Sequence, residues 1–179
     1  MQLFSIATVP LIAGFDFTIT AEEVAILKNK GAIGVNQDSL AVPGERLHVS
    51  RTGLGEVWAK PLADGSFAAM LWNRNNTYGH YTKIMGIYLN FAELGFTGKA
   101  DVYDEWADPP VHLGQFDGVL GNTTLPAGDS LFLRVVPTKG SHRLTGVGAW
   151  GAQATLGTGI DCGVPVSTLR PGHFWCGSN

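Results

Sequence analysis

Charged residues are scarce in this chain of 179 residues: only 15% are Asp, Glu, Lys or Arg, and the formal net charge is −3. The few basic residues form no run, and they do not alternate with aromatic residues in the way that follows a phosphate backbone. The composition therefore argues against a nucleic-acid-binding protein. The 45% of hydrophobic residues instead predicts a globular fold with a real core.

The sequence also lacks the pattern of a leader or of a membrane-spanning helix. The first fifteen residues carry no charge, and the first basic residue is Lys28, whereas a secretory leader has a positive charge before its apolar stretch. A membrane-spanning helix needs about 20 apolar residues, but Pro10 and Asp16 interrupt this apolar run. We therefore expect a buried element here, with neither a leader nor a membrane span.

Cysteine is rare as well, with only Cys162 and Cys176 in the chain. The two thiols could form one bridge or, together with His173, supply three ligands of a zinc site. Three ligands are an incomplete set and a weak signal for zinc. The sequence therefore favours free or simply paired thiols, and it predicts no metal site and no cofactor.

The N-terminal part contains signals for a strand and a helix. The continuous apolar run from Val9 to Gly14 predicts a strand covered on both faces, as in a parallel sheet. Thr20 and Glu23 have the spacing of a capping box, in which each side chain accepts a hydrogen bond from a free backbone N–H. The sequence therefore predicts a helix from Ala21 to Lys30 that ends at Gly31 as its C-terminal cap.

From Gly44 onward, short apolar-rich runs alternate with Gly, Pro, Asn and Asp, which is typical of an antiparallel sandwich. Between the second and third of these runs, Asp64-Gly65 predicts a tight primed turn in which both residues have a positive φ. The strands are expected at residues 46–51, 55–61, 66–74, 81–89, 99–106, 111–118 and 130–136.

The expected strand at 66–74 is apolar on both faces. One face carries Phe67, Ala69 and Leu71, and the other carries Ala68, Met70 and Trp72. The strand at 9–14 also needs a neighbour, because no parallel partner strand is predicted. We therefore expect another polypeptide to cover residues 1–17 and the face formed by Ala68, Met70 and Trp72.

A Gly-rich stretch follows Pro137. Residues 139–179 contain nine of the 24 glycines and both cysteines. This composition without periodicity predicts an irregular or disordered extension. The alternative is an ordered strap over a partner, because Trp150, Phe174 and Trp175 are unusual in freely solvated segments.

Several segments follow one another in the order seen in a known family. They are Val9 to Gly14, Val35-Asn36-Gln37-Asp38, the hairpin from Glu56 to Arg74, Asp104-Glu105-Trp106, and the run from Leu125 to Pro137. In spelling and order they resemble the C-terminal portion of the melibiase-type α-galactosidases. These enzymes are retaining glycoside hydrolases with a (β/α)₈ barrel followed by an antiparallel β domain.

The resemblance implies a mainly β fold, namely an antiparallel β-sandwich preceded by a short strand-helix remnant of a (β/α)₈ barrel. The resemblance covers about residues 1–137, and together with the shift in composition after Pro137 it divides the chain into the barrel remnant at 1–43, the sandwich at 44–138 and the Gly-rich tail at 139–179. Polypeptide is the expected partner, and carbohydrate is a further one.

In that family the two catalytic aspartates lie on earlier barrel strands, which would precede Met1, so the resemblance assigns no catalytic residue in this chain. Retaining hydrolysis needs two carboxylates about 5 Å apart. We therefore expect a fragment or subunit related to α-galactosidase that does not hydrolyse α-galactosides alone. The alternatives are a non-catalytic structural or accessory subunit of a larger assembly, and a carbohydrate-binding module.

One acidic cluster and one single aspartate are candidate functional residues. Asp101, Asp104, Glu105 and Asp108 cluster in sequence, but a solvated strand end is favoured over a general acid/base pair because nothing nearby indicates desolvation. The resemblance places Asp16 near the active-site face of the barrel. The family's usual polar neighbours are missing beside Asp16, so we expect a structural role there.

Aromatic residues and possible glycan acceptors complete the candidates. The rings of Trp58, Trp72, Tyr78, Tyr81 and Trp106 could stack on sugars, but at alternating strand positions core packing is favoured. The triplets Asn75-Asn76-Thr77 and Asn122-Thr123-Thr124 match the N-glycosylation pattern, and both are predicted to lie in accessible turns.

Overall fold

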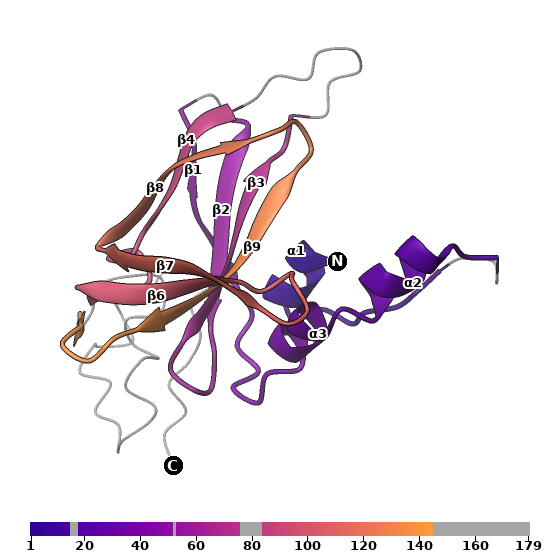
Figure 1. The fold of residues 1–179 in the computed structure, drawn as a ribbon, viewed down its shortest axis with the longest axis horizontal. Coiled ribbons are helices and arrows are strands. Elements are labelled where there is room, and N and C mark those ends of the chain that lie inside the picture. Colours follow the sequence, from indigo (N-terminus) through magenta and orange to yellow (C-terminus); the bar gives the residue numbers. More distant parts are fainter. Residues whose placement is uncertain (15–17, 52, 76–83, 145–179) are drawn as a thin grey trace, which may run out of the picture.

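A six-stranded antiparallel sheet forms the centre of the molecule (Figure 1). The computed structural model describes residues 1–14, 18–51, 53–75 and 84–144. Within these residues the strand order is β1-β2-β3-β9-β6-β7, and each neighbouring pair is antiparallel. The strands are β1 (Glu45–Val49), β2 (Gly55–Pro61), β3 (Phe67–Asn73), β9 (Ser130–Pro137), β6 (Lys99–Asp104) and β7 (Val111–Asp117).

A second layer lies against one face of this sheet. It contains β4 (Ile84–Asn90) paired with β8 (Val119–Leu125), and a short pair forms between β5 (Phe96–Thr97) and β10 (His142–Arg143). The main core lies between the layers and includes Leu71 and Leu133 from the large sheet and Leu89 from β4, all fully buried. The predicted mainly β, antiparallel sandwich is therefore confirmed.

Three short helices precede the sandwich: α1 (Gln2–Ile6), α2 (Ala21–Leu27) and α3 (Lys30–Asn36). In Figure 1, α1 and α3 lie beside the sheet, whereas α2 projects away from it. A second core forms on this side, where Ile6 of α1 and Val35 of α3 pack with Met70 and Phe132. Among the described residues, no helix is long and apolar enough to cross a membrane.

This second core covers the apolar face of β3 that we expected another polypeptide to cover. Ala68 and Met70 are buried, and the half-buried Trp72 packs at the edge of the same cluster. The cover comes from helices of the same chain.

The predicted helix differs from the structure at its C-terminal end. The capping box is confirmed, because the Glu23 N–H donates to Thr20 Oγ1 and the Thr20 N–H donates to Glu23 Oε2. However, α2 already ends at Leu27, and Gly31 lies inside α3 instead of capping α2. The reason is Asn29, whose side chain accepts from the Ala32 N–H at 2.8 Å and starts a new helix.

The strand predicted from Val9 to Gly14 is not formed, and Ile12 is 85% exposed. A strand needs a hydrogen-bonded neighbour, and no described strand pairs with this segment. At Thr8 the chain leaves α1 with a positive φ of 55°, and the Thr8 hydroxyl donates to the Val42 carbonyl at 3.2 Å. Tertiary context therefore overrides the apolar pattern.

The β2–β3 hairpin pairs in continuous register from Gly55 opposite Asn73 to Pro61 opposite Phe67. Its turn is not the predicted primed turn, because only Gly65 has a positive φ, of 84°. The Gly65 N–H donates to the Leu62 carbonyl and the Leu62 N–H donates to the Ser66 carbonyl. The loop is therefore a turn followed by a left-handed glycine, which also matches the twist of a hairpin.

Strand β8 was not predicted, because Gly121 and Asn122 are typical turn residues. Its pairing with β4, for example Thr123 opposite Ile87, places these residues in the second layer of the sandwich. The predicted irregular tail also begins differently, since β10 pairs with β5. Residues from 145 onward lie outside the described part of the chain.

Candidate functional site at the junction of helices and sandwich

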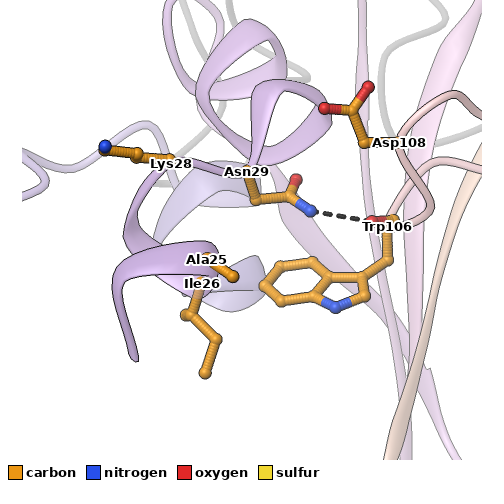
Figure 2. A pocket seen from close by; sticks show the side chains of 6 residues that line it. All are labelled: Ala25, Ile26, Lys28, Asn29, Trp106 and Asp108. Atoms are coloured by element: carbon orange, nitrogen blue, oxygen red, sulfur yellow. Dashed lines mark hydrogen bonds between the residues drawn. The ribbon is translucent and has the colours of Figure 1, made fainter. Parts of the chain in front are cut away.

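A pocket of about 370 Å³ lies between α2, the start of α3 and the loop that follows β6 (Figure 2). Its walls are Ala25, Ile26, Lys28, Asn29, Trp106 and Asp108. Figure 2 shows the indole of Trp106 beside Ala25 and Ile26, with Lys28 pointing away from the ring. The apolar groups therefore face one another, whereas the polar groups do not converge as they do in a typical ligand site.

The start of α3 is fastened to the loop after β6, and we call this contact the α3 clasp. The Asn29 side chain, which caps α3 through its carbonyl oxygen, also donates from Nδ2 to the Trp106 carbonyl at 2.7 Å. A Cβ on Gly31 would lie 2.0 Å from the Glu105 carbonyl oxygen, so this close approach requires glycine. The clasp consists of Asn29, Gly31, Glu105 and Trp106.

Next to the α3 clasp, the side chain of Arg134 lies between the carboxylates of Glu105 and Asp64. Its guanidinium lies 3.3 Å from Glu105 Oε1 and 2.6 Å from Asp64 Oδ2. Glu105 is 5% exposed, and its Oε2 is buried with no hydrogen-bond partner among the described residues. A buried acceptor without a partner is costly. Arg134 therefore offsets the cost of burial for only one of the two oxygens of the Glu105 carboxylate.

Burial raises the pKa of Glu105, and the neighbouring Arg134 offsets only part of this effect. Burial also acts to raise the pKa of Asp64, but hydrogen bonds from Ser66 and Arg134 outweigh it, so the Asp64 pKa is lowered. For Arg134, burial acts to lower the pKa, yet the two carboxylates leave it raised. Arg134 is therefore a permanent cation that holds Asp64 ionised more firmly than Glu105.

Lys60 joins β2 to both helices that cover the sheet. It is fully buried, and its Nζ donates to Thr8 Oγ1 at 2.8 Å and to the Val35 carbonyl at 2.9 Å. Burial lowers the pKa of Lys60, although Asp38 acts in the opposite direction. The ammonium therefore ties the end of α1 and the end of α3 to the sandwich.

A third buried charge, Glu56, lies at the other end of the same face. Its Oε1 accepts from Arg74 at 2.7 Å and lies 3.4 Å from Arg46, and its Oε2 accepts from the Trp58 indole at 2.8 Å. Both carboxylate oxygens are thus occupied by protein donors. Glu56 is a structural carboxylate, not an available acid or base.

The predicted acidic cluster does not form one site. Asp101 is beside His112, Asp104 accepts from the Trp106 N–H, and Asp108 pairs with Lys30. The expectation that this region is not desolvated is wrong for Glu105, which is buried. Along β6 the pattern indicated a solvated strand end, but the clasp folds over Glu105 from a distant segment.

Three of the five aromatic residues that could stack on sugars lie in the described part of the chain. Trp58, Trp72 and Trp106 are half-buried and pack against the second core, so the predicted packing role is confirmed for these three. Trp106 meets Phe132 edge-on with ring centroids 6.4 Å apart. Tyr78 and Tyr81 lie outside the described residues.

Other predictions also fall outside the described residues, namely those for Asp16, Cys162, His173 and Cys176. Within the described ranges, no group of three or more His, Cys, Asp or Glu side chains could hold a metal ion. Asn75, which was predicted to be accessible, is only 5% exposed, and its backbone N–H donates to Asn73 Oδ1. Asn122 lies within β8, not in a turn.

A second pocket, of about 240 Å³, lies between the β2–β3 loop and the end of β9. It contains one carboxylate, Asp64, as the pocket at α2 contains only Asp108. Both carboxylates form ion pairs, with Arg134 and Lys30 respectively. Neither pocket holds the two carboxylates that retaining glycoside hydrolysis requires.

Sequence reasoning missed Lys60, Asn29 and Gly31 as the residues that fix this junction. Lys60 carried a usable signal, since it is a single cation inside an apolar run in which both flanking residues become buried. Asn29 and Gly31 carried none beyond local helix signals. Their partners, Glu105 and Trp106, lie more than 70 residues away in the chain.

Residues 52–135 match the family described as the alpha galactosidase C-terminal beta sandwich domain. The α-galactosidase of Oryza sativa subsp. japonica is 35% identical over 109 residues, which are 59% of this chain and 24% of the relative. A probable α-galactosidase of Dictyostelium discoideum is 42% identical over 73 residues, which are 40% of this chain and 19% of the relative. The chain thus spans about a quarter or less of the length of these relatives.

The crystal structure of α-galactosidase I from Mortierella vinacea has a similar fold. It superposes with a TM-score of 0.62 at 23% sequence identity, and the match covers 75% of this chain and 33% of that one. The resemblance to the C-terminal portion of the melibiase-type enzymes is therefore confirmed.

Proposed function

We infer that this chain is the non-catalytic sandwich module of an α-galactosidase-type glycoside hydrolase. The starting point is the match of residues 52–135 to the α-galactosidase C-terminal β-sandwich domain. The chain contributes a folded platform and a docking surface. The hydrolytic carboxylates are supplied by a separate catalytic portion. The chain alone does not turn over α-galactosides.

The observation that carries this proposal is the state of the carboxylates. The pocket at α2 and the pocket at the β2–β3 loop hold one carboxylate each, and both form ion pairs. The buried Glu56 and Glu105 face arginines within the protein. The pocket carboxylates and the buried Glu56 and Glu105 are each paired with a cation of the chain, which supports the proposal that none of them acts as a free nucleophile or acid/base.

The outer surface of the helices supports the docking role. Phe4 is 57% exposed, Ile12 85% and Ile26 45%, and α2 buries none of its residues. All three belong to the N-terminal part of the chain, before the sandwich, and an exposed apolar surface is typical of a contact with another polypeptide when such residues form a contiguous patch. We propose that residues 1–17 and α2 contact the catalytic portion, while the buried sides of α1 and α3, at Ile6 and Val35, attach this segment to the sandwich.

The first experiment is an assay of the purified 179-residue chain on a chromogenic α-galactoside. The expected result is no release of chromophore above buffer. Hydrolysis that survives repurification and follows the protein peak would overturn the non-catalytic assignment. Folding is checked on the same sample by a cooperative urea transition.

The second experiment tests docking in a chimera, in which this chain replaces the homologous C-terminal part of the rice enzyme. Retained α-galactosidase activity is the expected result. Ile12→Asp and Ile26→Asp are expected to reduce the soluble, active fraction, because they place a charge in the proposed contact. The matched control is Val119→Asp, a 44% exposed residue on β8, and equal loss in all three variants would contradict the proposed surface.

A further inference from the structure

A group of polar and aromatic side chains lies on β6 and β7, the last two strands in the order of the large sheet, and the proposed function does not use it. In Figure 1, β6 and β7 lie side by side at one edge of the large sheet. Their register puts Asp101 opposite Gln115 and Tyr103 opposite His112. Directly opposed residues share a face of an antiparallel sheet. We call these four residues the β6–β7 patch.

A β-bulge makes this grouping possible. His112 and Gln115 are three residues apart, so regular alternation would place them on opposite faces. The register shifts between Val102 and Tyr103, and Gly114 adopts a φ of 135°. Leu113 is the extra residue that restores His112 and Gln115 to one face. Bulges of this kind re-aim side chains and occur next to functional sites more often than elsewhere.

The contacts within the patch are long and accessible. His112 Nε2 lies 3.3 Å from Asp101 Oδ1, and Gln115 Nε2 lies 3.4 Å from the same oxygen. The rings of Tyr103 and His112 are 4.9 Å apart. The side chains of His112 and Asp101 are 49% and 31% exposed. The four groups are therefore aligned by the sheet, yet their hydrogen-bonding capacity is not used up.

A similar trio, formed by His48 of β1, Tyr88 of β4 and Glu93 after β4, shows an arrangement in which the polar groups are paired. His48 stacks on Tyr88 at 4.7 Å and lies 2.7 Å from Glu93 Oε2, and the His48 side chain is only 19% exposed. There the imidazole and the carboxylate satisfy each other. In the β6–β7 patch both protein contacts use Oδ1 of Asp101, so Oδ2 has no hydrogen-bond partner among the described residues.

We propose that the β6–β7 patch binds a neutral pyranose ring of a carbohydrate. A sugar ring presents C–H groups that pack on an aromatic face such as Tyr103, and hydroxyl groups that both donate and accept. The Asp101 carboxylate accepts, and the Gln115 amide donates and accepts. The Asp101 carboxylate disfavours an anionic ligand. The acceptor groups of Asp101 and the amide of Gln115 lie beside the Tyr103 ring, and this combination fits a sugar with several hydroxyl groups better than a single cation.

This inference does not depend on the proposed docking surface, because none of the four patch residues lies in residues 1–17 or in α2. The test uses the full 179-residue chain, labelled with ¹⁵N and titrated with methyl α-galactopyranoside. The expected result is amide shift changes confined to β6 and β7, with a dissociation constant of about 1 to 10 mM for a shallow site. Sorbitol, which has hydroxyl groups but no ring, is expected to cause no such shifts.

Tyr103→Ala is expected to weaken binding by about 3- to 10-fold, the range for loss of one aromatic stacking contact. Gln115→Ala, at an exposed position, is the second variant in case Tyr103→Ala does not fold. Tyr88→Ala is the matched control and should leave the dissociation constant unchanged. Absent shifts, equal shifts with sorbitol, or unchanged binding in a folded Tyr103→Ala or Gln115→Ala variant would each overturn the proposal. If the patch variants instead abolish activity of the chimera without affecting sugar binding, the surface is a polypeptide contact and the proposal is wrong.

Discussion

The two faces of the six-stranded sheet are stabilised in different ways. The face toward β4 and β8 is covered by a continuous apolar core that includes Leu71, Leu89 and Leu133. The face toward α1 and α3 has a smaller apolar cluster crossed by buried charges, namely Glu56, Lys60 and Glu105. Apolar burial stabilises in proportion to area, whereas a buried charge mainly penalises the wrong arrangement.

This difference indicates two levels of stability within one chain. The sandwich should unfold as a unit, while the helical segment depends on a few directional contacts at Lys60 and at the α3 clasp. Such an arrangement suits a docking segment, because its position is defined without a large core of its own. The following predictions test or refine this contrast, beginning with the largest effect.

Leu71→Ala in the main core is expected to lower the free energy of unfolding by about 2–5 kcal/mol, the range for a fully buried leucine. Leu71 is 0% exposed and belongs to the central strand β3. Urea unfolding followed by circular dichroism measures the loss. A change below about 1 kcal/mol would show that this core does not dominate stability.

Lys60→Ala is expected to cost about 1–3 kcal/mol, because it leaves the buried Val35 carbonyl and Thr8 hydroxyl without their donor. Lys60→Met also removes the ammonium but keeps the packing of the aliphatic stem, so its loss should be smaller. Urea unfolding is again the measurement. Unchanged stability in both Lys60→Ala and Lys60→Met would contradict the role of the ammonium as a buried tie.

Gly31→Ala and Gly34→Ala form a matched pair in α3. At Gly31 a Cβ would lie 2.0 Å from the Glu105 carbonyl oxygen, whereas at Gly34 it would meet nothing within 4 Å. Gly31→Ala should therefore destabilise by about 1–3 kcal/mol, and Gly34→Ala should stabilise by about 0.5–1 kcal/mol through helix propensity. Equal effects, measured by thermal unfolding, would mean that the α3 clasp is not formed.

The smallest expected effect is the pH dependence of the free energy of unfolding. The raised pKa of Glu105 means that the folded chain binds this proton more tightly than the unfolded chain. Its contribution to stability therefore increases as the pH falls through the raised pKa toward the ordinary value of 4.5. For Asp64 the pKa is lowered, so stability is lost only as the pH falls below its ordinary 3.8.

Glu105→Gln separates the pH range in which Glu105 changes stability from the range in which Asp64 does. The variant should lose the gain in stability on acidification above pH 4.5, and it should keep the loss below 3.8 that belongs to Asp64. Denaturant midpoints measured across this pH range report both slopes. An unchanged slope above 4.5 would show that Glu105 is not the group responsible.

The sequence predicts the sandwich better than the junction. The β2–β3 hairpin and the Thr20–Glu23 capping box depend on neighbouring residues, so local patterns identify them. Strand β8 and the absence of a strand at Val9 to Gly14 depend on which segments pair in space. The α3 clasp could not be predicted, because the contact of Gly31 with Glu105 depends on how two distant segments meet.

Native-state hydrogen exchange on the full chain tests the central contrast most directly. The amides of Ile33 and Gln37 in and after α3, which bond to Asn29 and Ile33 carbonyls, are compared with the amides of β3. The account predicts that the helical amides exchange through an opening that costs much less free energy than unfolding of the sandwich, and that Lys60→Ala accelerates only the helical amides. Exchange of both groups with the same free energy, shifted equally by Lys60→Ala, would contradict it.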